Sequence, residues 1–315
     1  MSRVSRFRRF VVVAGLSALV VVLAAGCGGG GEARASEGKL QVTTTSTMVT
    51  DLVERVGGEK VEVTGLMGPG VDPHLYRASQ RDVLALSEAD AVFYSGLFLE
   101  GQMVEVMEKV DRQKPAVPVT EDIPRGELLA SEDYEDQFDP HVWFDVGMWR
   151  SSVGPVVETL SELDPANAAY YERRGEAYER ELVRLDREVE REVSSIPEER
   201  RVLVTAHDAF RYFGREYGME VRGLQGISTE AEAGTGDVSG LADYLAEEEI
   251  PAIFVESSVS PRSIEATQAA SEARGWDVEM GGELYADAMG GPGTSAGSYT
   301  GMVRENVDTI TEALR

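Results

Sequence analysis

The chain of 315 residues is poor in cysteine, histidine and basic residues. Cys27 is its one cysteine, so no disulfide can form within the chain, and a thiolate site for a soft ion such as copper(I) is disfavoured. Only 30 lysines and arginines stand against 56 aspartates and glutamates, which gives a formal net charge of −26. So acidic a surface repels phosphate backbones. Nucleic-acid binding is therefore not expected, whereas cations are attracted without being selected.

One long uncharged run is present, at the N-terminus. A basic stretch precedes residues 10–26, which carry no charge and are followed directly by Cys27. A membrane-spanning helix normally needs about 20 apolar residues, and four glycines follow Cys27, so we expect an export signal rather than a span. The pattern resembles a bacterial lipoprotein signal, in which the cysteine is lipidated. Residues 1–26 are predicted to be the signal peptide, and residues 27–38 the lipidated Cys27 and a flexible tether.

Alternating apolar and amphipathic segments predict an α/β fold with two lobes. Strand-like runs occur at residues 40–45, 61–66, 89–95 and 116–119, and again at residues 201–206, 221–224, 251–257 and 276–282. Helices are expected from near residue 46, over residues 77–88, and after the first three runs of the second series. This βαβ organisation predicts two lobes, residues 39–163 and 198–315, each a mostly parallel sheet flanked by helices.

The segment between the two series, residues 164–197, predicts one long helix. Asp164 can cap its N-terminus with Pro165 at the first helical position, and Pro197 ends it, so a helix of about 45 Å fits. An apolar stripe follows helical spacing along it: Tyr171, Tyr178, Leu182, Leu185 and Val189. A coiled coil and an ordinary surface helix are the alternatives. No heptad is sustained on both sides of Gly175, and we therefore expect a helix that joins the lobes.

All three histidines of the chain follow apolar, strand-like runs. They are His74 in VDPHLY, His141 in FDPHVWFD and His207 in VLVTAHDAF. Neutral imidazole is a common ligand of transition metals, and the loops at strand ends are where α/β proteins bind ligands. Any one of these histidines alone is more often a buried, hydrogen-bonded side chain. Together they predict one metal site, which should lose affinity steeply below about pH 6 as protons compete for imidazoles with an ordinary pKa.

Six motifs, in order and covering most of the chain after the signal, resemble a known family. They are GVDPHLYRAS (70–79), FDPHVWFDV (138–146), TAHDAFRYF (205–213), LQGISTEAEAG (224–234), IFVESSVSP (253–261) and LYADAMG (284–290). They are similar to those of the metal-binding lipoproteins that deliver zinc or manganese to ABC transporters, the TroA-like solute-binding protein family 9. The resemblance implies two lobes joined by a rigid helix, with the metal in the cleft. It also supplies a fourth ligand, Asp287, which the residues alone could not single out among 56 acids.

The expected cargo is one Zn²⁺ or one Mn²⁺. Three imidazoles and one carboxylate suit tetrahedral zinc, and a bidentate carboxylate would raise the coordination number enough for manganese. The segment 132–139 is acidic and lacks the histidines that zinc carriers of this family often have there. His207 stands where many manganese carriers have a glutamate, whereas GISTEAEAG resembles the manganese branch. The choice between the two metals stays open.

Several neighbours of the histidines are candidates for supporting roles. Asp72, Asp139, Asp145 and Asp208 could orient an imidazole or accept backbone hydrogen bonds. In the two DPH turns the proline fixes its own φ and restricts the aspartate before it, which aims the histidine rigidly. A separate set is expected only to pack beneath the site: Trp143, Tyr212 and Phe213.

The resemblance implies a monomeric carrier on the outer face of the cytoplasmic membrane or in the periplasm. A lipid would anchor it to the membrane, and its partners would be an ABC transporter permease and the ATPase of that transporter. No catalytic role is expected. A surface adhesin and a zinc-dependent hydrolase are the alternatives, but a hydrolytic zinc keeps one coordination position for water, which Asp287 would fill here.

Overall fold

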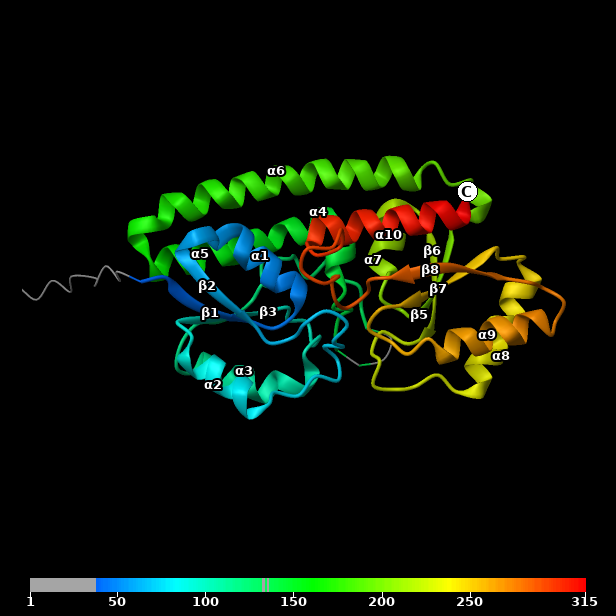
Figure 1. Ribbon diagram of the computed structural model, residues 1–315, viewed down its shortest axis with the longest axis horizontal. Helices are drawn as coiled ribbons and strands as arrows, with labels where there is room; N and C mark the ends of the chain where they lie inside the picture. Colours follow the sequence, from blue (N-terminus) through cyan, green and yellow to red (C-terminus); the bar gives the residue numbers. More distant parts are fainter. Residues whose placement is uncertain (1–37, 132–133, 135) are drawn as a thin grey trace, which may run out of the picture. The chain divides into compact units, whose positions relative to one another are not determined.

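The computed structural model describes residues 38–131, 134 and 136–315 (Figure 1). These residues fall within one compact unit, residues 36–315. The expected signal peptide, Cys27 and the expected tether up to residue 37 lie outside the described residues. In the part of the chain that is described, no helix combines the length and apolar character that crossing a membrane requires.

The N-terminal lobe is built on a four-stranded parallel sheet with the strand order β2-β1-β3-β4. Its strands are β1 (Leu40–Thr44), β2 (Val61–Gly65), β3 (Ala91–Tyr94) and β4 (Ala116–Pro118). Its helices are α1 (Thr47–Gly57), α2 (Gln80–Glu88), α3 (Val104–Asp111), α4 (Val146–Trp149) and α5 (Val153–Leu163). Figure 1 shows α1 and α5 on one side of this sheet and α2 and α3 on the other. The sheet is therefore covered on both faces, as parallel sheets usually are.

The C-terminal lobe contains two parallel strand pairs, β5 with β6 and β7 with β8, and β5 lies next to β7. The strands are β5 (Val202–His207), β6 (Glu220–Gln225), β7 (Ala252–Glu256) and β8 (Glu279–Leu284). The helices are α7 (Arg211–Tyr217), α8 (Thr235–Glu247), α9 (Arg262–Glu272) and α10 (Tyr299–Leu314). Each of the first three strands leads into a helix, and this order confirms the predicted α/β organisation.

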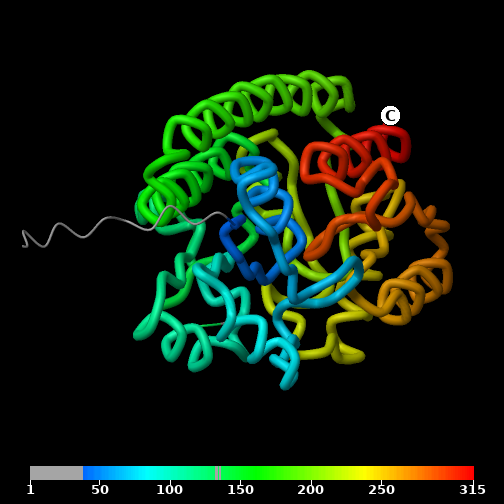
Figure 2. The backbone as a smooth tube through the Cα atoms, turned by 60° about the vertical axis from the view of Figure 1, so that its left-hand side comes forward, coloured from blue at the N-terminus to red at the C-terminus, as the bar shows by residue number. Residues whose placement is uncertain are grey.

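The long helix α6 spans Ala168–Val193 and contacts helices of both lobes, among them α1, α5, α7 and α10. The predicted apolar stripe is buried along its whole length. Together with apolar residues of both lobes it forms one continuous hydrophobic cluster, from Leu40 to Leu314. Figure 2 follows α6, in green, to its end near the C-terminus, where Arg315 donates to Ser195 Oγ at 2.8 Å. The helix thus packs both lobes against a shared core.

The predicted start of this helix was too early. A short 3-10 helix, Pro165–Asn167, precedes α6, which at 26 residues is about 39 Å long rather than about 45 Å. The Asp164 carboxylate caps no backbone N–H. It accepts instead from the side chains of Asn167 at 2.7 Å and Tyr171 at 3.0 Å. The acid therefore fixes the turn that leads into α6.

Two other elements begin about three residues later than expected. Helix α2 begins at Gln80 rather than near residue 77, because Ser79 and Asp82 form a capping box there. Strand β8 begins at Glu279 and runs to Leu284, later at both ends than the predicted run of residues 276–282. This extension carries the end of β8 to within three residues of Asp287.

Candidate metal centre

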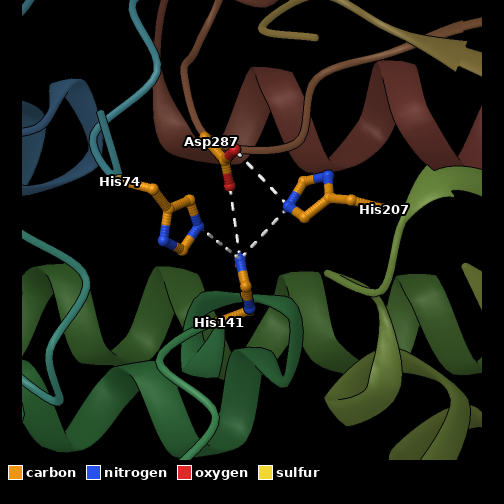
Figure 3. Close-up of side chains that lie close together, drawn as sticks. All are labelled: His74, His141, His207 and Asp287. Carbon is orange, nitrogen blue, oxygen red and sulfur yellow. Dashed lines mark hydrogen bonds and ion pairs between the residues drawn. The ribbon is translucent and has the colours of Figure 1, made fainter. Parts of the chain in front are cut away.

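The four predicted ligands come together from four separate segments (Figure 3). His74 lies in the loop between β2 and α2, and His207 is the last residue of β5. Asp287 lies in the loop between β8 and α10. His141 differs from the expectation, because it follows no sheet strand. An isolated bridge between Ala130 and Phe138 precedes it, and His141 stands at the N-terminus of the 3-10 helix Val142–Phe144.

The ligand atoms lie close enough together to share one metal ion, with His141 Nε2 near each of the other three. His141 Nε2 lies 3.3 Å from His74 Nε2, 3.4 Å from His207 Nε2 and 3.4 Å from Asp287 Oδ1. His207 Nε2 lies 3.5 Å from Asp287 Oδ2. Bonds of about 2.0–2.1 Å to a tetrahedral zinc place neighbouring ligand atoms about 3.3–3.4 Å apart. The three distances from His141 match this value, and all four ligand atoms lie within 4.8 Å of one another, so the set could hold one ion.

Asp139 holds the His141 ring in the orientation that a metal ligand needs. Asp139 Oδ1 accepts from the backbone N–H of His141 at 3.0 Å and from its Nδ1 at 2.8 Å. Because the neutral ring carries its proton on the nitrogen that faces the carboxylate, Nε2 is left with a free lone pair. The predicted orienting role of Asp139 is confirmed in this geometry.

Glu256, at the end of β7, orients the ring of His207 in the same way. This role was not predicted from the sequence. Glu256 Oε1 accepts from the backbone N–H of His207 at 2.9 Å, and Oε2 accepts from Nδ1 of the ring. Glu256 lies within the motif IFVESSVSP, and it is the buried acid of a strand that neighbours β5. Its position at the end of a strand is the one feature of the sequence that could have identified Glu256 as a residue of the site. The pairing with His207 depends on which strands are neighbours, which a single sequence does not give.

Of the other predicted acids, Asp72 and Asp145 accept backbone hydrogen bonds, which was one of the two expected roles, and neither is bonded to an imidazole ring among the described residues. Asp72 Oδ1 accepts from the backbone N–H of His74 at 2.8 Å, so it fixes the turn rather than the ring. Asp145 caps α4 through the Met148 N–H at 2.8 Å and pairs with Arg215. Asp208 forms an ion pair with Arg211 at 3.6 Å. Neither Asp145 nor Asp208 is bonded to a histidine ring in the described part of the chain.

The aromatic residues near the site are buried, as expected for packing residues, and two of them also hydrogen bond. The Trp143 ring centre lies 5.2 Å from that of His141, and Trp143 Nε1 donates to the carbonyl oxygen of Ala286 at 3.1 Å. Tyr212 donates to the carbonyl oxygen of Asp139 at 2.9 Å, and Phe213 is 3% exposed. These contacts hold the segments that carry His141 and Asp287 in place.

The acceptor atoms of His141, His207 and Asp287 that face one another need a positive charge between them. With Nδ1–H facing Asp139 or Glu256, the Nε2 lone pairs of His141 and His207 point at one another and at Asp287. While these rings are neutral, the buried Asp287 Oδ1 accepts no hydrogen bond from any described residue. Such a cluster is stable only when protons or a metal cation lie among these atoms.

The pKa shifts of His141, His207 and Asp287 agree with a need for positive charge among these atoms, whereas that of His74 does not. Burial alone would lower the pKa of His141, but its hydrogen bonds to Asp139 and Asp287 outweigh burial and raise it to about 9. Burial likewise opposes the charges of Glu256 and Asp287, which raise the pKa of His207 well above its usual value. For Asp287, burial is outweighed by His207 and by the hydrogen bonds from His141 and His207, so its pKa falls well below normal. His74 differs, because burial lowers its pKa to about 3.

The family model ZnuA, described as zinc-uptake complex component A, periplasmic, matches residues 42–313. The chain belongs to this family. The family is described as a component of an uptake complex, which agrees with the expected solute-binding protein.

Relatives of known name cover nearly the whole chain. The manganese-binding lipoprotein MntA of Bacillus subtilis (strain 168) is 47% identical over 290 residues, 92% of this chain and 94% of MntA. The manganese ABC transporter substrate-binding lipoprotein PsaA of Streptococcus mitis is 29% identical over 303 residues, 94% of this chain and 96% of PsaA. The solved periplasmic zinc-binding protein TroA of Treponema pallidum has a TM-score of 0.86 and 49% identity, and covers 88% of this chain and 99% of TroA. The two-lobed ZnuA-family fold is thereby confirmed.

Proposed function

We propose that this protein captures one divalent transition-metal ion, zinc or manganese, outside the cytoplasm and delivers it to an ABC transporter. The ligands are His74, His141, His207 and Asp287. The observation that carries the proposal is the buried set of three imidazole nitrogens and one carboxylate, all within 4.8 Å of one another. His74 and His141 come from the N-terminal lobe and His207 and Asp287 from the C-terminal lobe, so the ion is held by both lobes at once.

The donor set is compatible with both metals. Three nitrogens and one carboxylate oxygen form a tetrahedral zinc site, and both oxygens of Asp287 face the cluster, Oδ1 toward His141 and Oδ2 toward His207. Binding through both oxygens adds a fifth ligand atom, which suits manganese. Names of relatives point both ways, since MntA is named for manganese and TroA for zinc.

The division of the chain follows from this role. Residues 1–26 are the signal peptide, Cys27 carries the lipid, and residues up to 38 tether the carrier to the outer face of the membrane. The lobes are residues 39–163 and 198–315, joined by residues 164–197. The carrier acts as a monomer and hands its ion to a permease whose ATPase drives import. Support comes from the lipoprotein and ABC transporter names of relatives.

No particular observation favours an adhesin or a hydrolase. The names of the relatives describe metal binding and transport. A hydrolytic zinc needs one open position for water and a nearby general base. Here the fourth corner of the tetrahedron is taken by Asp287, whose side chain is 1% exposed. The geometry is that of a site that holds an ion without activating water.

Calorimetric titration of the metal-free protein with Zn²⁺ and with Mn²⁺ tests the proposal. The unmodified protein should bind one ion. His141→Ala should lower the affinity by more than about a hundredfold, because losing a ligand should cost more than the 10- to 100-fold typical of changes around the ligands. Circular dichroism of the variant in chelator controls for folding. Near-original affinity in a folded His141→Ala protein would remove His141 from the site.

A further inference from the structure

Residues 226–231, which we call the cleft loop, follow β6 and provide none of the four ligand atoms. They nevertheless belong to one of the six motifs, LQGISTEAEAG. Three of them, Ile227, Ser228 and Thr229, are buried, with 3%, 9% and 7% of their surface exposed. A polar loop of the C-terminal lobe that is buried beside the site must contact something there. Its contacts cross to the N-terminal lobe.

Thr229 reaches the loop that carries His74. Its hydroxyl donates to Asp72 Oδ2 at 2.6 Å, while Asp72 Oδ1 accepts the backbone N–H of His74 at 2.8 Å. The two oxygens of one carboxylate thus join a residue of the C-terminal lobe to the backbone of a ligand in the N-terminal lobe. Asp72 is half-buried, and hydrogen bonds that a carboxylate accepts are stronger than those between neutral groups.

His74 depends on this connection more than the other histidines do. Asp139 holds the ring of His141 from the same loop, and Glu256 holds that of His207 from a neighbouring strand. No carboxylate is hydrogen-bonded to the His74 ring within the described residues. The position of His74 is therefore set mainly through its backbone, and so through Asp72.

A second contact of the cleft loop lies beside the first. Glu230 accepts from the Gln102 side chain of the N-terminal lobe and from the hydroxyl of Tyr134 at 3.0 Å. His74 and Glu230 both line a cavity of about 20 Å³, which has room for a single water molecule. His74 is thus the ligand that borders this cavity, and the cleft loop forms part of its wall.

We propose that Thr229 is a positioning residue that holds His74 in the closed site across the cleft and thereby sets how long the metal ion stays bound. The inference rests on the proposed function. When the lobes separate, the Thr229–Asp72 bond breaks and the loop carrying His74 is released from the C-terminal lobe. His141 and His207 keep their own carboxylates and remain in place, so His74 leaves the ion first.

The test compares Thr229→Val with Thr229→Ser in protein preloaded with one equivalent of Zn²⁺. Valine keeps the shape of threonine without the hydroxyl, and serine restores the hydroxyl. Each protein is mixed rapidly with excess EDTA, and zinc loss is followed by tryptophan fluorescence, which should respond because the Trp143 ring lies beside His141. Thr300→Val is the matched control, because it removes a hydroxyl that contacts Glu181 between α10 and α6.

Zinc should leave the Thr229→Val protein about tenfold faster than the unmodified protein, the size expected for one lost hydrogen bond to a charged group. Thr229→Ser should return to within about threefold of the original rate, and Thr300→Val should not change it. An unchanged rate in Thr229→Val, or an equally fast rate in Thr229→Ser, would overturn the positioning role. If the unmodified protein bound neither Zn²⁺ nor Mn²⁺, the proposed function would fail and this role with it.

Discussion

Two buried acids that are not ligands, Asp139 and Glu256, determine which nitrogen each imidazole presents to the metal. Each accepts both the backbone N–H and the Nδ1 of its histidine, so backbone position and ring orientation are fixed together. The same carboxylates favour protonation of the rings when no metal is present. The residues that prepare the site therefore also make protons compete with the metal.

Metal binding should release protons at a higher pH than ordinary histidines would allow. Hydrogen bonds to Asp139 and Asp287 raise the pKa of His141 to about 9, and the charges of Glu256 and Asp287 raise that of His207 well above its usual value, so metal binding must displace protons from these rings. The pKa of His74, lowered to about 3, means that this ring has no proton to lose. Calorimetry in buffers of different ionisation enthalpy should count between about one and two protons released per ion.

The metal affinity should depend on pH because protons leave the site when the ion binds. Affinity should rise as the pH is raised toward 9 and fall tenfold or more per unit below it, because at least about one proton must leave for each ion bound. The sequence predicts the loss only below about pH 6, from the ordinary pKa of histidine, and the carboxylates move it upward. Affinity that is constant between pH 8.5 and 6.5, with no proton release, would show that His141 and His207 are not ligands.

The sequence predicts all four residues that meet at the site, yet by two different routes. The histidines stand out because there are only three, whereas Asp287 comes only from the family resemblance. Asp139 could be foreseen, since a DPH turn places the acid two residues before the ring. Glu256 and Thr229 could not, because their partners lie 49 and 157 residues away in the chain. Contacts of this kind depend on strand order and lobe closure.

At the scale of elements, the stripe of α6 is the feature that the sequence predicts best. Helical periodicity fixes which face is buried, and the structure buries that face. What periodicity does not reveal is the partner of each residue. Gly175 illustrates this, because a Cβ there would lie 2.6 Å from Cγ2 of Val157. The glycine lets α5 and α6 approach closely, a reason that only the packed structure provides.

Replacing Leu185 with alanine should destabilise the metal-free protein. Leu185 is fully buried in the cluster that α6 shares with both lobes. Removal of a buried leucine side chain typically costs about 2–5 kcal/mol of unfolding free energy. Denaturant unfolding in EDTA, followed by circular dichroism, measures it. The exposed Arg187→Ala on the same helix is the control and should change stability by less than about 0.5 kcal/mol. Equal stability of the two variants would show that α6 is not packed as described.

At the scale of the whole molecule, the ion should stabilise a protein that is already folded. The lobes share an extensive apolar core, so folding does not require metal. An ion that binds only the folded cleft adds about 2.7 kcal/mol when its free concentration is 100 times its dissociation constant. The melting temperature should therefore rise with added Zn²⁺ or Mn²⁺, while the chelated protein keeps its far-ultraviolet circular dichroism. Loss of all secondary structure in chelator would instead indicate a structural metal site and would contradict a carrier.

X-ray absorption at the zinc edge, on protein loaded with one equivalent of Zn²⁺, tests the central claim most directly. Three imidazoles and one carboxylate should give four nitrogen or oxygen neighbours at about 2.0–2.1 Å, with the multiple scattering that imidazole rings produce. His74→Ala should lower the imidazole contribution by about one third, since one ring of three is removed. A spectrum of oxygen neighbours without imidazole scattering would contradict a site built from His74, His141 and His207.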